Sequence, residues 1–269
     1  MLVYAFARLG TPAMQNTVRY APNEFSMPRI YTSTVPSVPV LSTSIFTRLF
    51  SSPDPSIIGG YPASASAFID SDSGITLTRA QTKRLALSLA YGLRNHPTTL
   101  ARRGDVIMIF APNCLSWPIV LFASSQCKNS PSSCSYLRSS SQVAAGLRCT
   151  LANSAYTPKE LAFQYGDSGA KLVFTNEEGV PTVLAALEQL GISRTQGLKR
   201  IIVLEAGLGW AGALVASRKP KVTQLLCMQD LLQQGSLDEE EKFEGQDCHE
   251  TAYLCYSSGT TTSFFFSHV

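Results

Sequence analysis

Short apolar runs and amphipathic helical stretches alternate along the chain from residue 56 to residue 256, and this alternation limits the possible folds more than any other feature. Unbroken apolar runs are typical of strands buried on both faces, whereas apolar residues spaced three or four apart are typical of helices that cover a sheet. We therefore expect an α/β fold in which helices flank a largely parallel sheet. Strands are predicted at 106–110, 147–151, 171–175, 200–205 and 251–256, a hairpin at 67–69 and 75–77, and helices at 78–95, from about 115, from 157 and at 181–190.

Two of the predicted helices have clear start signals. Thr78 is a typical N-cap residue, and the helix after it carries leucines on one face. The sequence Thr157-Pro158-Lys-Glu160 combines a capping box with proline at the first helical position. The leucines of the first helix are Leu85, Leu89 and Leu93.

Two segments depart from the alternation. Residues 1–56 are rich in Pro, Ser and Thr, which prevents any long helix, and we expect residues 1–26 to form a disordered extension. Residues 125–142 contain 8 Ser in 18 positions without any periodicity, and their removal would join two apolar stretches into one helix leading to Gly146. We interpret 125–142 as an insert that a gene-model artefact explains, with a flexible surface loop or phosphorylation site as the alternative.

Composition excludes several classes of protein. The net charge is only +3 and charged residues make up 15% of the chain, so we expect no nucleic-acid binding through a basic stripe. No apolar run approaches the roughly 18 residues that a membrane span needs. The 7 cysteines show no CxxC motif, which favours reduced thiols over a zinc site and favours the cytoplasm as the compartment.

The richest chemical motif follows the last predicted strand. Small residues after a strand allow backbone N–H groups to surround an anion, and hydroxyl side chains add further donors. This composition is suited to binding the phosphates of a nucleotide, although a solvated turn can have the same composition. The candidate phosphate-binding residues are Ser257, Ser258, Gly259, Thr260 and Thr261.

With these motifs, the sequence resembles the AMP-forming adenylate ligases, and specifically the acyl- and aryl-CoA ligases of the 4-coumarate–CoA ligase type. Tyr256-Ser-Ser-Gly-Thr-Thr is similar to the start of that family's phosphate-binding signature, which normally continues Gly-x-Pro-Lys-Gly. The likeness extends in the family's order to GDVIMIFAPN (104–113), AAGLRCTLANSAYTPKEL (144–161) and DSGAKLVFT (167–175). The resemblance implies that residues 27–262 are an incomplete N-terminal part of the adenylate-forming (AMP-binding) domain.

The resemblance also implies a reaction. In this family a carboxylic acid attacks the α-phosphorus of ATP, with Mg²⁺ present, to give an acyl-adenylate from which the thiol of CoA displaces AMP. Residues 257–261 would hold the β- and γ-phosphates, while no residue is assigned a proton-transfer or metal-binding role. His96, His249 and the acidic cluster from Asp238 to Asp247 are expected to be ordinary surface groups.

The sequence departs from the family after Thr261. Thr262 replaces the expected glycine, Pro-Lys-Gly is absent, and residues 263–269 have the character of an aberrant tail. We therefore expect a truncated, inactive member of the family that does not productively bind ATP with Mg²⁺ and CoA, with a non-catalytic remnant or binding module as the alternative. Some relatives carry a peroxisomal C-terminal tripeptide, which Ser-His-Val is not.

A second motif supports a different class of enzyme. Gly207, Gly209 and Gly212 match GxGxxG after a predicted strand, and Asp230 lies downstream as a dinucleotide site requires. A dinucleotide-dependent oxidoreductase is therefore a third hypothesis. Too few residues follow Asp230 to complete a doubly wound domain, so the ligase interpretation is favoured.

Overall fold

The computed structural model describes residues 42–99, 101–124, 146–204, 207–212, 225–238, 243 and 250–256, and the backbone of 267–268. The predicted extension 1–26, the predicted insert 125–142 and most of the predicted tail 263–269 lie outside these residues. The elements described below all belong to the unit Leu41–Val269. None of the helices in these ranges is long and apolar enough to cross a membrane.

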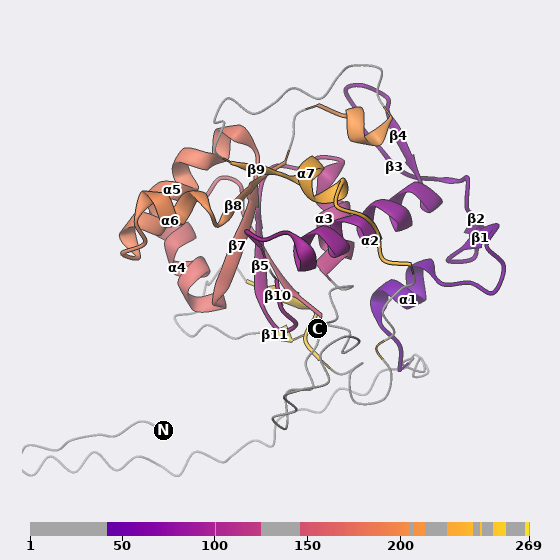
Figure 1. Ribbon diagram of the computed structural model, residues 1–269, viewed down its shortest axis with the longest axis horizontal. Helices are drawn as coiled ribbons and strands as arrows, with labels where there is room; N and C mark the ends of the chain where they lie inside the picture. Colours follow the sequence, from indigo (N-terminus) through magenta and orange to yellow (C-terminus); the bar gives the residue numbers. More distant parts are fainter. Residues whose placement is uncertain are drawn as a thin grey trace, which may run out of the picture. The chain divides into compact units, whose positions relative to one another are not determined.

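A mostly parallel β-sheet forms the centre of this unit (Figure 1). Its spatial order is β11-β10-β6-β5-β7-β8-β9, and every neighbouring pair is parallel except β10 with β11. The α/β class with a largely parallel sheet is thus confirmed. The strands are β5 (Val106–Phe110), β6 (Arg148–Ala152), β7 (Ala170–Thr175), β8 (Ile201–Val203), β9 (Leu226–Cys227), β10 (Tyr253–Cys255) and β11 (Ser267–His268).

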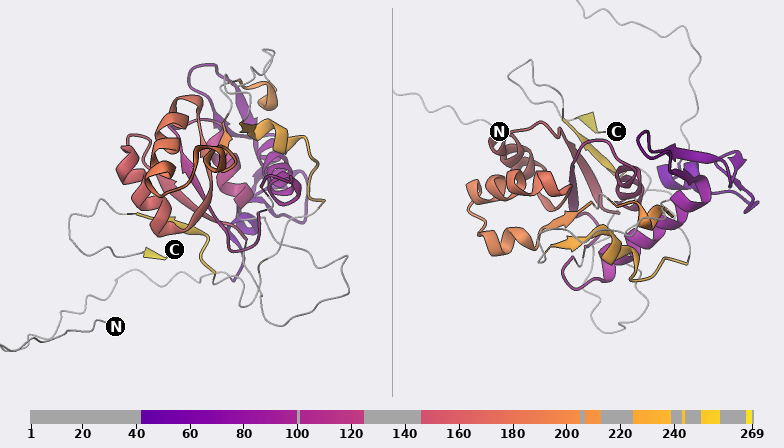
Figure 2. Two further views of the ribbon diagram at one scale, coloured as in Figure 1. Left: turned by 60° about the vertical axis from the view of Figure 1, so that its left-hand side comes forward. Right: turned by 90° about the horizontal axis from the view of Figure 1, so that it is seen from above.

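Helices lie on both faces of the sheet (Figure 2). The long helix α2 shares one face with α3 and α7, and α4, α5 and α6 cover the other. Their bounds are α2 (Arg79–Asn95), α3 (Ser116–Ser124), α4 (Pro158–Ser168), α5 (Val180–Gln189), α6 (Arg194–Leu198) and α7 (Met228–Leu232), with the 3-10 turns η1 (Glu177–Gly179) and η2 (Gly209–Ala211).

A smaller region precedes the sheet. It contains helix α1 (Ile45–Phe50), the hairpin β1 (Ile57–Ile58) with β2 (Tyr61–Pro62), and the predicted hairpin, now β3 (Ser66–Ile69) with β4 (Thr76–Thr78). Phe46 and Phe50 of α1 are buried against α2, and their ring centroids lie 4.6 Å apart. Helix α1 ends at Ser51, so within residues 42–56 the expectation that no long helix forms is met.

The central strand β5 shows why the sheet is covered on both sides. All five of its side chains are buried, and they alternate between two clusters. Ile107 and Ile109 face α2, α3 and α7, whereas Met108 and Phe110 face α4 and α5. This explains the unbroken apolar run in the sequence, since a strand between two helical layers has no solvent-facing side.

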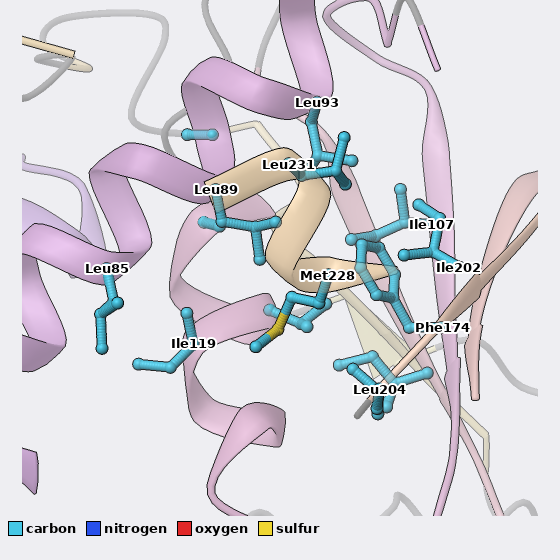
Figure 3. Close-up of a cluster of buried hydrophobic side chains, with 14 of the residues drawn as sticks. Leu85, Leu89, Leu93, Ile107, Ile119, Phe174, Ile202, Leu204, Met228 and Leu231 are labelled. Carbon is cyan, nitrogen blue, oxygen red and sulfur yellow. The ribbon is translucent and has the colours of Figure 1, made fainter. Parts of the chain in front are cut away.

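The predicted leucine face of α2 packs as expected (Figure 3). Leu85, Leu89 and Leu93 are all buried, and they lie over Met228 and Leu231 of α7 and over the sheet. The hydroxyl of the predicted N-cap, Thr78, accepts the backbone N–H of Gln81 while the Gln81 side chain accepts the N–H of Thr78.

Candidate functional site

The predicted phosphate-binding residues Ser257, Ser258, Gly259, Thr260 and Thr261 lie outside the described residues, but the strand that leads into them is well defined. β10 falls inside the predicted strand 251–256. It pairs in parallel with β6, with Tyr253 opposite Cys149 and Leu254 opposite Thr150. Because parallel strands end at the same edge, Tyr256 leaves the sheet beside the carboxyl ends of β6 and β5. Ligands of open α/β sheets bind at that edge.

The start of β10 is attached to the turn before β5. The Arg103 guanidinium donates a hydrogen bond to a Glu250 carboxylate oxygen at 3.4 Å, and it lies over the Phe243 ring, 5.6 Å from the centroid. The Arg103 side chain is only 9% exposed, so this ion pair is better shielded from water than a surface pair. The backbone attaches the same end of β10 to β6, because Ala252 O accepts the N–H of Cys149 at 2.9 Å.

The end of β10 is attached to α4. The Tyr256 hydroxyl donates a hydrogen bond of 2.6 Å to Asp167 Oδ2. Burial raises the pKa of Tyr256, and the neighbouring Asp167 carboxylate raises it further, so Tyr256 stays protonated and able to donate. Asp167 lies within the DSGAKLVFT motif, yet nothing in the sequence alone indicates that it contacts the residue before the phosphate-binding segment.

The strand order also shows where the chain connections change direction, a position that the sequence could not locate. Numbered along the chain, the parallel strands run 6-2-1-3-4-5, so the connections reverse direction between β5 and β7, where doubly wound sheets often bind ligands. In this structure the 3-10 turn η1 fills that position. A Cβ on Gly179 would lie 2.1 Å from Thr175 Oγ1 and 3.4 Å from the Phe110 ring, which places η1 directly against the strand ends.

A cavity of 480 Å³ lies at the other edge of the sheet. It is lined by residues at the amino ends of β5 and β7 and by the segment before β8. Lys171 Nζ and Asp105 Oδ1 form an ion pair of 2.6 Å in its wall. Its position opposite the carboxyl edge separates it from the candidate phosphate-binding segment.

The glycine motif of the oxidoreductase hypothesis does not have the geometry of a dinucleotide fingerprint. Gly209 begins the three-residue turn η2, which Gly212 ends in a left-handed conformation with φ of 97°. Asp230 lies in the first turn of α7, where its carboxylate accepts the N–H of Cys227 at 2.9 Å and so caps the helix. A dinucleotide fingerprint needs a helix that begins at the glycines and a free acid for the ribose, so these described contacts remove the support for that hypothesis.

The other residues considered in the sequence have ordinary contacts or lie outside the described ranges. His96 ends α2, and its Nδ1 accepts the N–H of Thr98 at 3.2 Å. His249 and most of the acidic cluster 238–247 are not among the described residues. Within the described ranges no group of three or more His, Cys, Asp or Glu gathers as metal ligands.

The family model described as AMP-binding enzyme matches residues 142–263, a range that includes β6 to β10 and the candidate segment. The chain is 26% identical over 202 residues to 4-coumarate–CoA ligase-like 4 of Oryza sativa subsp. japonica, covering 72% of this chain. It is 29% identical over 195 residues to 4-coumarate–CoA ligase-like 3 of Arabidopsis thaliana, also covering 72% of this chain. It spans 29% of the length of each of these two relatives.

Solved structures agree on the fold. A long-chain-fatty-acid–CoA ligase from Archaeoglobus fulgidus covers 88% of this chain with a TM-score of 0.58 at 17% identity, and the match takes in 39% of that structure. A red-emitting luciferase from Phrixothrix hirtus covers 75% of this chain and 32% of its own, with a TM-score of 0.53 at 17% identity. Residues 142–263 are thus similar to the AMP-binding enzyme family, and the chain is similar to 4-coumarate–CoA ligase-like proteins of plants.

Proposed function

We propose that the chain provides the nucleotide-phosphate-binding part of a ligase that activates a carboxylic acid with ATP for transfer to CoA. In this proposal residues 257–261 hold the β- and γ-phosphates while the acid attacks the α-phosphorus, forming an acyl-adenylate and releasing pyrophosphate. The thiol of CoA then displaces AMP to give the thioester.

One observation carries the proposal. The candidate segment, which the family match includes, directly follows β10, and β10 runs parallel to β6. The segment therefore starts at the carboxyl edge of the sheet, where a turn of small residues can direct backbone N–H groups and hydroxyls at an anion. The relatives are named 4-coumarate–CoA ligase-like, and a solved structure of similar fold is named a long-chain-fatty-acid–CoA ligase, so the substrate class is proposed only as an organic carboxylic acid.

We further propose that the 269-residue chain binds nucleotide phosphates but does not form a thioester by itself. Thr262 stands where the family signature has glycine, and Phe264, Phe265 and Phe266 stand where it has Pro-Lys-Gly. Attack by a carboxylate on a phosphorus atom brings negative charges together, so its rate depends on correctly placed cations. Losing one such electrostatic group typically costs about 10²- to 10³-fold in rate.

The test measures binding and turnover separately. Titration calorimetry with ATP and with inorganic triphosphate measures affinity, and pyrophosphate release and thioester formation are followed with cinnamic, benzoic and fatty acids. We expect the double variant Thr260→Ala with Thr261→Ala to lose phosphate affinity, and the control Thr98→Ala, in the wall of the opposite cavity, to keep it.

Two results would contradict the proposal. Absence of ATP binding by the unmodified chain would remove the assignment of residues 257–261. Thioester formation that disappears in the Thr260 and Thr261 double variant would show that the chain is itself a working ligase.

The cytoplasm is the proposed compartment. The described cysteines Cys114, Cys149, Cys227 and Cys255 are all free thiols, as is usual in reducing compartments. One relative is named Peroxisomal OPC-8:0-CoA ligase 1 of Arabidopsis thaliana, so imaging of a fluorescent fusion with cytoplasmic and peroxisomal markers is the direct test.

A further inference from the structure

Helix α4 is connected to two residues near the end of β10, Leu254 and Tyr256, shortly before the candidate phosphate-binding segment. The first connection is the hydrogen bond from Tyr256 to Asp167, which joins residues 89 positions apart. Side chains alternate along a strand, so Leu254 and Tyr256 point to the same side. Leu254 packs against the apolar cluster that α4 and α5 contribute, which is the side from which Asp167 reaches Tyr256.

The second connection is a buried relay of hydrogen bonds. Gln164 of α4 is 1% exposed, and its Nε2 donates to Thr150 Oγ1 at 2.9 Å and to Leu151 O at 3.0 Å. The Thr150 hydroxyl then donates to Leu254 O at 3.1 Å. Accepting from an amide while donating to a carbonyl strengthens both bonds, because each polarises the other.

Both connections start from one surface of α4. Gln164 and Asp167 are three positions apart in the helix, so their side chains lie on neighbouring positions of the same face. The helix itself is held at both ends, by the Thr157–Glu160 capping box and by Gly169, whose φ of 67° is left-handed. A rigid helix therefore contacts β10 at the Leu254 carbonyl and again at the Tyr256 side chain.

We propose that Gln164 and Asp167 are positioning residues that fix the backbone from which residues 257–261 leave the sheet. The inference rests on the proposed function, since it treats those residues as the phosphate-binding segment. The backbone donors of such a segment act on phosphate only if their direction is set before the ligand arrives. A carboxylate is suited to this task because a hydrogen bond to an ionised acceptor is shorter and stronger than one between neutral groups.

The first experiment is a double-mutant cycle on ATP affinity, with Asp167→Ala, Tyr256→Phe and both together. Each single change removes the same hydrogen bond, so we expect each to weaken ATP binding by about tenfold and the double variant to be no weaker than either single one. Asp167→Asn retains an uncharged acceptor and should recover part of the loss. Asp70→Ala serves as the matched control, since the Asp70 carboxylate accepts from Ser73 in the turn between β3 and β4, and ATP affinity should stay unchanged.

The second experiment needs no nucleotide and therefore separates this inference from the proposed function. Hydrogen exchange is measured on the peptide that covers residues 254–262 in the unliganded chain. We expect faster exchange there in Asp167→Ala, Tyr256→Phe and Thr150→Val, and unchanged exchange in Asp70→Ala. If the unmodified chain fails to bind ATP but exchange responds in this way, the function is wrong and the positioning role stands. Unchanged exchange in Asp167→Ala and Tyr256→Phe, or additive losses of affinity in the cycle, would overturn the positioning role.

Discussion

Replacing Gly92 by alanine tests the packing of α2 against α7. A Cβ built on Gly92 would lie 2.3 Å from the carbonyl oxygen of Leu231, 2.7 Å from its carbonyl carbon and 2.8 Å from its Cα. These atoms belong to the backbone of α7, so no change of side-chain rotamer relieves the overlap. The added methyl group can be accommodated only if α7 moves away and weakens the contacts of Met228 and Leu231 with the core (Figure 3).

The expected magnitude follows from two opposing terms. Alanine is favoured over glycine inside a helix by about 1 kcal/mol. Overpacking a well-packed core costs about 1–3 kcal/mol, and a clash with backbone lies at the upper end of that range. We therefore expect Gly92→Ala to lower the free energy of unfolding by about 1–2 kcal/mol.

Gly166 provides the matched control, because it makes the same chemical change in a helix without the clash. A Cβ on Gly166 of α4 would have its nearest atom, Leu190 Cδ2, at an ordinary 3.7 Å. Gly166→Ala should raise the free energy of unfolding by about 0.5–1 kcal/mol. Both variants are compared with the unmodified chain by urea unfolding followed by circular dichroism. If Gly92→Ala stabilises the chain as much as Gly166→Ala, the close approach of α7 to α2 is wrong.

Three further predictions concern thiols, acid stability and the unplaced segment. Cys255 is exposed, whereas Cys149 is buried and burial raises the pKa of its thiol, so iodoacetamide at pH 8 should alkylate Cys255 before Cys149. Mass spectrometry that finds Cys149 alkylated as fast as Cys255 in the folded chain would contradict this. Hydrogen bonds from Thr157 lower the pKa of Glu160 below its ordinary 4.5, so the contribution of Glu160 to stability is present above pH 4.5 and is lost as the pH falls through the pKa of the folded state. Glu160→Gln should therefore destabilise the chain more at pH 7 than at pH 3. An equal effect in urea unfolding at both pH values would refute the reasoning. Deleting residues 125–142 should leave soluble yield and resistance to proteolysis unchanged, whereas a lower yield would show that the segment is structural.

The strands could be predicted from the sequence because burial on both faces produces long apolar runs. β5, β6, β7 and β8 all lie within a residue or two of the predicted ranges. The order of strands could not be predicted, since periodicity reports burial and carries no information about neighbours. The pairing of β10 with β6 joins Leu254 to Thr150 across about a hundred residues, whose described part contains three other strands and four α-helices, and no local signal marks it.

The positioning contacts were missed for a related reason. Gln164 and Asp167 are polar residues on an amphipathic helix, where such residues normally face water. Gln164 is instead buried, because the Thr150 hydroxyl and the Leu151 carbonyl satisfy its amide nitrogen. The role of Gly92 could not be predicted either, since a glycine in a helix normally indicates only a position of low helix propensity. In each case the partner lies in another element, so only the three-dimensional arrangement shows the role.

The shortness of β10 explains why side-chain contacts matter at its two ends. Only two of its residues are paired with β6, and a ladder that short restrains the direction of the following backbone weakly. Two side-chain contacts supply further restraint: Arg103 with Glu250 before the strand, and Asp167 with Tyr256 after it. The two contacts lie at opposite ends of β10. The first comes from the turn before β5 and the second from α4. A segment that must present donors to a phosphate in a fixed direction can therefore begin on a three-residue strand, because its orientation depends on the helical layer as well as on the sheet.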